Sequence, residues 1–189
     1  MLHYGLSNIV VGFIIWLPVV YVGMAIAEYV AHRWFMHKRT FVTKKEFEHH
    51  AVQHHGHRLM EPLFPYIDLP VRYHLIFGIP GWGGFLIGFL SGGPYALGGM
   101  IATLTMFFCH SYFYSKVHRA QHDLEENWTQ RLPWFAELKR HHLDHHIRPS
   151  RNFAVVFLWT DKLFGTHWRS ADVPNISAAH AAISKAKIS

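Results

Sequence analysis

Cysteine and charged residues are scarce in this chain of 189 residues. Its single cysteine excludes a disulfide scaffold, a thiolate cluster and a zinc ribbon, which all need several thiolates. Only 16% of the residues are charged, whereas 50% are hydrophobic and 16% are aromatic, a balance opposite to that of disordered chains. Histidine is abundant, because its 18 residues equal lysine and arginine together. The length allows one domain, or two at most.

Two long stretches carry no charged side chain at all. Residues 1–27 and 74–115 contain no Asp, Glu, Lys or Arg, so all charge lies in residues 28–73 and 116–189. The net charge of +6 would suit a nucleic acid, but such a protein carries its basic residues on a folded, soluble face. Apolar runs that alternate with charged, histidine-rich blocks are typical of a membrane protein, and we expect no nucleic-acid partner.

Three apolar runs are candidates for membrane spans. Residues 9–27 form a run of 19 residues, which is about long enough to cross the hydrocarbon core. A signal peptide explains this run less well, because no basic segment precedes it and no small-residue cleavage site follows it. Residues 75–90 and 95–114 flank a Ser-Gly-Gly-Pro turn and predict a helical hairpin that enters and leaves by one side. A buried soluble hairpin is the alternative.

The basic residues predict the orientation of these spans. All 18 lysines and arginines lie after residue 32, within the two histidine-rich blocks, so the positive-inside rule places both blocks in the cytoplasm. We therefore predict an all-α fold, an integral membrane bundle of about three spans with a cytoplasmic, His-rich helical cap. We expect a single domain over residues 1–169 and a loose tail over residues 170–189.

Ten histidines fall into four groups with short spacings. Residues three or four apart share one face of a helix, whereas adjacent residues diverge by about 100°. Pairs within one group are therefore predicted to bind one ion together, and adjacent histidines are predicted to serve two different ions. The groups are His32 and His37; His50, His54 and His55; His118 and His122; and His142, His145 and His146.

The spacings make this prediction specific. One-ion pairs are expected for His50 with His54, for His118 with His122, and for His142 with His145. His54 and His55 should diverge toward two ions, as should His145 and His146, and so should His32 and His37, which are five residues apart. The pattern therefore predicts two metal ions. Imidazole ligands suit Fe, Zn, Cu or Ni and do not choose between them.

Residues beside these groups are candidates for supporting the ligands. His110, near the end of an apolar run, is the one other histidine for which we expect such a role. Carboxylates often orient metal-bound imidazoles by accepting their free N–H, and Glu28, Asp123, Asp144 and Asp161 lie beside the groups. Helix capping or surface charge is the alternative for each of them.

The ordered set of groups resembles the fatty acid hydroxylase/sterol desaturase superfamily of integral membrane proteins. The sequence from Asn152 to Thr166 is similar to that family's ending, although Thr160 interrupts its usual Trp-Asp pair, and Tyr114 before His118 also fits. Asn152, which begins this ending, is a further candidate for supporting the ligands. The resemblance covers roughly residues 25–168. The segment AEYVAHRWFMH also resembles bacterial beta-carotene hydroxylases.

The resemblance implies that the ten grouped histidines bind two metal ions, typically iron, with zinc possible in isolated protein. Members use O2 and two electrons to hydroxylate or desaturate an unactivated C–H bond of a lipid, such as a fatty acyl chain or a sterol. No catalytic residue is expected beyond the metal ligands. Such chemistry requires a redox metal, because side chains cannot make the oxidant.

The electrons are expected from a separate electron-transfer protein, because no glycine-rich nucleotide-binding motif is present. A basic cytoplasmic face would suit an acidic carrier. Carotenoid hydroxylation and lipid desaturation remain open as alternatives. A non-catalytic metal-binding or metal-transport membrane protein is a more remote alternative. Transport needs ligands inside the spans, and the predicted spans are almost free of them, with His110 as the exception.

Overall fold

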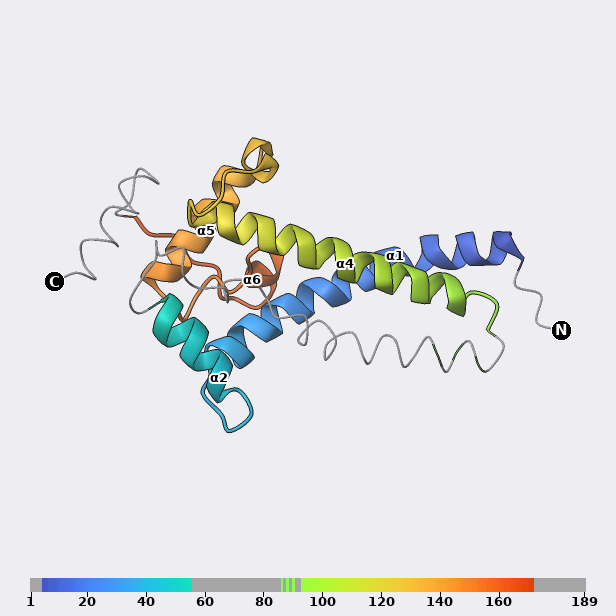
Figure 1. The fold of residues 1–189 in the computed structure, drawn as a ribbon, viewed down its shortest axis with the longest axis horizontal. Coiled ribbons are helices and arrows are strands. Elements are labelled where there is room, and N and C mark those ends of the chain that lie inside the picture. The colour runs from blue at the N-terminus through green and yellow to red at the C-terminus, as the bar shows by residue number, and fades with distance from the viewer. Residues whose placement is uncertain (1–4, 56–85, 87, 89, 91–92, 172–189) are drawn as a thin grey trace. The chain divides into compact units, whose positions relative to one another are not determined.

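A computed structural model describes residues 5–55, 86, 88, 90 and 93–171, and within these residues all regular structure is helical, as predicted. The α-helices are α1 (Leu6–Val30), α2 (Lys44–Phe47), α4 (Ala96–Gln121), α5 (Phe135–Ile147) and α6 (Trp159–Leu163) (Figure 1). Two π-helices, Ala31–Met36 and Glu48–His54, continue α1 and α2 directly, and a 3₁₀-helix covers Trp128–Arg131. The chain divides into two compact units, residues 1–27 with 69–113 and residues 28–68 with 114–189.

In the first unit, α1 and α4 contact each other backbone to backbone through two glycines. A Cβ atom added at Gly12 would lie 2.4 Å from the carbonyl oxygen of Tyr95, and one added at Gly98 would lie 2.2 Å from that of Ile9. Only glycine permits these contacts, and small residues allow membrane helices this close approach.

Among the described residues, two helices are long and apolar enough to cross a membrane, Leu6–Met36 and Ala96–Gln121. Only 11% of the most apolar window of the first is buried, and large apolar side chains such as Leu6, Ile14 and Val19 are exposed along it. This exposure is unlike that of a core helix in a soluble protein. The run 75–90, predicted as a further span, lies largely outside the described residues. The number of three spans therefore stays a prediction.

The second unit is organised around α5, most of whose residues are buried, including Leu138, Leu143 and all four of its histidines. After α5 the chain continues as the irregular segment 148–158 and then enters α6. Asn152 in this segment has a positive φ of 55°, and its side chain donates to the carbonyl of Trp168 at 2.7 Å and accepts from the N–H of Trp168 at 2.7 Å. The tail predicted for residues 170–189 lies outside the described residues beyond residue 171.

Candidate metal centre

All ten grouped histidines belong to the second unit, and nine of them are buried. They come from four places in the chain that the fold brings together: the two π-helices with the residue that follows each, the C-terminal turn of α4 with the residue after it, and α5. Their side chains form two clusters, site A and site B.

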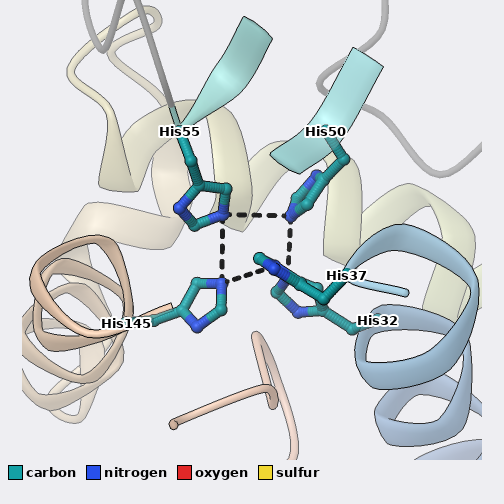
Figure 2. Close-up of side chains that lie close together, drawn as sticks. All are labelled: His32, His37, His50, His55 and His145. Carbon is teal, nitrogen blue, oxygen red and sulfur yellow. Dashed lines mark hydrogen bonds between the residues drawn. The ribbon is translucent and has the colours of Figure 1, made fainter. Parts of the chain in front are cut away.

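Site A consists of five histidines whose ligand nitrogens all lie within 4.8 Å of one another. Figure 2 shows their rings pointing toward a common centre from separate segments. Neighbouring Nε2 atoms are 2.8–3.2 Å apart around a closed circuit. The members of site A are His32, His37, His50, His55 and His145.

Site B consists of His54, His122, His142 and His146, again with ligand nitrogens within 4.8 Å of one another. The Nε2 atom of His142 lies 2.7 Å from that of His122 and 3.1 Å from that of His146. It also lies 3.1 Å from the Nε2 atom of His118, so that His118 stands at the edge of this site. Site B and His118 at its edge together account for the remaining five grouped histidines.

Two imidazoles of site A show which nitrogen faces the centre. The Nδ1 atom of His32 donates to the carbonyl of Phe153, and the Nδ1 atom of His145 donates to that of Arg151 at 2.6 Å. A carbonyl only accepts, so the proton is on Nδ1 and the Nε2 of a neutral ring has a lone pair. These Nε2 lone pairs point into the cluster.

A metal ion fits this arrangement. Bonds of about 2.1 Å from a metal to imidazole nitrogens, set at right angles, would place neighbouring nitrogens about 3.0 Å apart. The Nε2 atoms of site A are 2.8–3.2 Å from their neighbours. The Nε2 lone pairs of His32 and His145 face the centre, so a cation placed there would bind both. The donor set is entirely nitrogen, which suits Fe, Zn, Cu or Ni and does not select one.

The π-helices explain which histidines share a site. The N–H of His37 donates to the carbonyl of His32 at 3.2 Å, and that of His55 donates to the carbonyl of His50 at 3.0 Å. This i to i+5 bonding aligns residues five apart, so both pairs enter site A. The expectation that His32 and His37 diverge is therefore wrong, because it assumed α-helical geometry.

Two predicted one-ion pairs are also wrong. His50 and His54 lie in different sites, because the π-helix pairs His50 with His55 instead. His142 and His145 are likewise separated, because α5 places His142 beside His146, four residues later, at 3.1 Å between their Nε2 atoms. The i to i+5 geometry of the π-helix decides the first pair, and the four-residue spacing of the α-helix decides the second.

The remaining spacing predictions agree with the structure. The adjacent residues His54 and His55 enter different sites, as do His145 and His146. The rings of His118 and His122 lie together, with centroids 5.0 Å apart. Whether the ten histidines are metal ligands stays a prediction.

Burial keeps these imidazoles neutral. It lowers the pKa of His50, His55, His142 and His146 well below the ordinary value, and the neighbouring imidazoles lower each of these pKa values further. Burial lowers the pKa of His145 to about 4, although the hydrogen bond to Arg151 opposes this effect. Neutral imidazole is the form that binds metal, so the clusters are ready to bind at neutral pH.

Asp161 is predicted to accept an N–H from a grouped imidazole, but it binds backbone N–H groups near the site. It accepts hydrogen bonds from the N–H groups of Phe153 at 2.9 Å and Ala154 at 2.7 Å and from the hydroxyl of Thr166 at 2.6 Å. Its fourth partner is Nε2 of His141 at 2.9 Å. Burial raises the pKa of Asp161, but these hydrogen bonds outweigh it and hold that pKa below its usual value.

The other candidate carboxylates support the fold. Glu28 accepts from the N–H groups of Val155 at 2.8 Å and Val156 at 2.9 Å. Asp144 is buried and forms an ion pair with Arg140 at 3.1 Å, and Asp123 forms one with Lys139 at 2.5 Å.

Asn152 and His110 are the two remaining candidates for supporting the ligands. Asn152 donates to the backbone carbonyls of His141, at 3.2 Å, and Trp168. His110 belongs to the first unit, whereas all ten grouped histidines belong to the second. The roles proposed for Asn152 and His110 stay predictions.

Sequence reasoning missed three contributors to the site. The sequence assigns His141 no role, although this residue precedes His142 and its Nε2 atom lies 2.9 Å from the carboxylate of Asp161. The carbonyls of Phe153 and Arg151 hold two imidazoles of site A, and a backbone group leaves no signal in a sequence. The one signal in the sequence that could have indicated a role for His141 is its position directly before the last histidine group.

Comparisons with known proteins bear on this centre. Neither a search of curated proteins nor one of solved structures found a match. The sequence model of the fatty acid hydroxylase family matches residues 17–166, which include every member of both sites. Because this match covers most of the chain, the protein belongs to the fatty acid hydroxylase family, within the fatty acid hydroxylase/sterol desaturase superfamily.

Proposed function

We propose that this protein is a membrane-bound dimetal oxygenase that uses O2 to hydroxylate a C–H bond of a lipid, such as a fatty acyl chain or a sterol. The family points to an oxidoreductase enzyme, and the two apolar helices with the family indicate an integral membrane protein. The two histidine clusters are suited to metal ions.

The observation that carries the proposal is the contact between the two clusters. The ring of His55 in site A stacks on the ring of His146 in site B, with centroids 4.1 Å apart and planes 17° apart. Adjacent pairs, His54 with His55 and His145 with His146, also supply one histidine to each site. Ions held by the two sites would therefore act on one substrate together.

The ten grouped histidines would hold the two ions, which we propose are iron, although zinc can replace iron in isolated protein. Bound iron would supply the O2-derived oxidising power that amino-acid side chains lack. The chain's own residues keep the imidazoles neutral by burial, orient two of them through backbone carbonyls, and exclude bulk water from the nitrogens. Within the part of the chain that the structure describes, both clusters consist of histidines alone, unlike the carboxylate-rich diiron sites of four-helix bundles.

The proposal also covers the source of the electrons, the side of the membrane on which the clusters lie and the extent of the domain. We propose that a separate electron-transfer protein supplies the two electrons. The second unit would lie in the cytoplasm, because the lysines and arginines all lie after residue 32 in the two histidine-rich blocks. Residues 1–169 would act as one functional domain.

Lipid analysis tests the reaction. Lipids extracted from cells that express the protein are compared by mass spectrometry with those from cells that express the His142→Ala variant. A lipid that gains one oxygen only with the unaltered protein supports hydroxylation. Loss of two hydrogens would indicate a desaturase, and a change confined to carotenoids would indicate a carotenoid hydroxylase. No change in any lipid would contradict an oxygenase.

Metal analysis tests the centre independently of the lipid. Gently purified protein should contain two transition-metal ions per chain by elemental analysis. One ion or none would contradict the dimetal assignment.

A further inference from the structure

Two imidazoles of site A that come from different helices are held by a single short segment. His32 follows α1 and His145 lies in α5, yet their Nδ1 atoms donate to carbonyls only two residues apart, those of Phe153 and Arg151. The position of this segment therefore sets the orientation of two rings at once. We call residues 151–157 the template segment.

Two buried carboxylates hold the template segment. Asp161 accepts from the N–H groups of Phe153 and Ala154, and Glu28 accepts from those of Val155 and Val156. The exposed fractions of these two acidic residues are 0% and 2%. Hydrogen bonds to an ionised acceptor are about twice as strong as neutral ones. Four successive amides are thus fixed from two sides.

The hydrogen bonds that hold Phe153 lead directly to a metal ligand. Asp161 binds the N–H of Phe153 at 2.9 Å, and the carbonyl of the same residue accepts from His32. The hydroxyl of Thr166 donates at 2.6 Å to Oδ1 of Asp161, the same oxygen that accepts from Phe153, and so helps to hold this carboxylate in place. A change at Asp161 therefore moves the carbonyl that orients His32.

Site B has a different environment around its ring nitrogens. The Nδ1 atoms of His142 and His146 are buried and have no hydrogen-bond partner within residues 5–55 and 93–171. These two rings are positioned by packing, for example by the contact between the rings of His55 and His146. The template segment therefore acts on site A and not on these ligands of site B.

We infer that Asp161 is a positioning residue for site A alone: through the template segment it orients His32 and His145, so that weakening Asp161 releases the ion of site A and leaves that of site B bound. This inference rests on the proposed dimetal function. Loss of a hydrogen-bonding partner behind metal-bound histidines typically weakens metal binding about 10- to 100-fold. The two sites should therefore differ in their response to one substitution.

The variant Asp161→Asn tests this inference in the full-length protein. In Asp161 both carboxylate oxygens accept hydrogen bonds from backbone N–H groups, those of Phe153 and Ala154. Asparagine keeps only one of these oxygens, and its NH₂ group cannot accept from the second N–H. After a mild chelator wash that leaves the unaltered protein with two ions, the variant should hold one ion per chain by elemental analysis. The apparent affinity for the ion that is lost should fall about 10- to 100-fold.

Asp144→Asn is the matched control. Asp144 is also buried and lies in α5, but its carboxylate pairs with Arg140 instead of the template segment. This control should lower the thermal midpoint, because it leaves a buried arginine without its counter-charge, and should still hold two ions. Loss of an ion in Asp144→Asn to the same degree would overturn the inference, because general destabilisation would then explain the result.

A combined variant identifies the ion that remains. His142→Ala should hold one ion, in site A, and His142→Ala with Asp161→Asn should hold none. Two ions in Asp161→Asn after the wash, or one ion in the combined variant, would overturn the inference. Fewer than two ions in the unaltered protein would instead overturn the proposed dimetal function. If Asp161→Asn does not fold, Glu28→Gln should speed the release of one ion and not of both.

Discussion

His37 lies five residues after His32, its N–H donates to the carbonyl of His32 at 3.2 Å, and the Nε2 atoms of the two side chains are also 3.2 Å apart. On an α-helix, positions five apart point about 140° away from each other. The wider turn of the π-helix removes this divergence. The inserted residue of the turn therefore places two histidines in one site, and π-turns are often found at functional sites.

Deleting Trp34 should restore an α-helical turn between His32 and His37 and remove His37 from site A. The helix would then lose the bonding from His32 to His37 that the structure shows at 3.2 Å. We expect the deletion variant to hold fewer metal ions than the unaltered protein by elemental analysis. Trp34→Ala keeps the number of residues and changes a side chain that is 42% exposed, so it should hold both ions. Two ions in the deletion variant would contradict the role of the π-turn.

His49 and His50 are adjacent but should respond differently to replacement by alanine. His50 belongs to site A, whereas His49 contacts Gln53 at 3.2 Å and belongs to neither site. His50→Ala should lower the metal content and abolish turnover, because it removes a ligand from a shared centre. His49→Ala should keep the metal and most of the activity. Equal losses in the two variants would show that the clusters do not identify the ligands.

Stability should fall as the pH is lowered through 6.5. Burial lowers the pKa of His50, His55, His142 and His146 in the folded protein and that of His145 to about 4. Below pH 6.5 the unfolded chain binds more protons than the folded chain, so each such histidine lowers the free energy of unfolding by up to about 1.4 kcal/mol per pH unit.

The metal-stripped protein should therefore have a lower thermal midpoint at pH 5.5 than at pH 7.5. Calorimetry at constant ionic strength measures this difference. A midpoint that is equal at both pH values, or higher at pH 5.5, would show that the buried imidazoles are not neutral in the fold.

Gly98→Ala should destabilise the first unit. Its Cβ would lie 2.2 Å from the carbonyl oxygen of Ile9 and 2.5 Å from the backbone nitrogen of Phe13, so α1 and α4 would have to separate. We expect a cost of about 1–3 kcal/mol, which is typical of overpacking. Gly23→Ala is the control, because nothing lies within 4 Å of its added Cβ. Thermal unfolding in detergent compares the two, and equal midpoints would contradict the close contact.

Thiol labelling of intact cells tests the predicted topology, with single-cysteine variants built after replacing Cys109, the only native cysteine. Gly92→Cys should be labelled from outside, whereas Lys44→Cys and Lys185→Cys should not, because the basic blocks are predicted to be cytoplasmic. Residues 92 and 185 lie outside the described residues. Labelling of Lys185→Cys from outside would contradict the orientation and the proposed function with it.

Much of the candidate centre could be predicted from residue spacing. The divergence of His54 from His55 follows from the 100° step of any helical turn, and the structure separates them as predicted. The predictions for His32 with His37 and for His50 with His54 nevertheless fail, because these residues lie in π-turns that hydrophobic periodicity does not reveal. Their i to i+5 bonds depend on the protein that surrounds the turn. The predicted pair of His142 with His145 fails because α5 places His142 beside His146.

The sequence alone determined the helical class, the apolar helices and the four groups of histidines, nine of which meet in the two clusters, because these depend on composition and on neighbours within a few residues. The tertiary structure decided how these histidines divide between two sites and which groups orient them. His32 and Phe153 are 121 residues apart, and the acceptor is a backbone carbonyl that every residue possesses. Only the folding of the template segment between Glu28 and Asp161 selects that carbonyl, because long-range packing determines which backbone groups meet a given side chain.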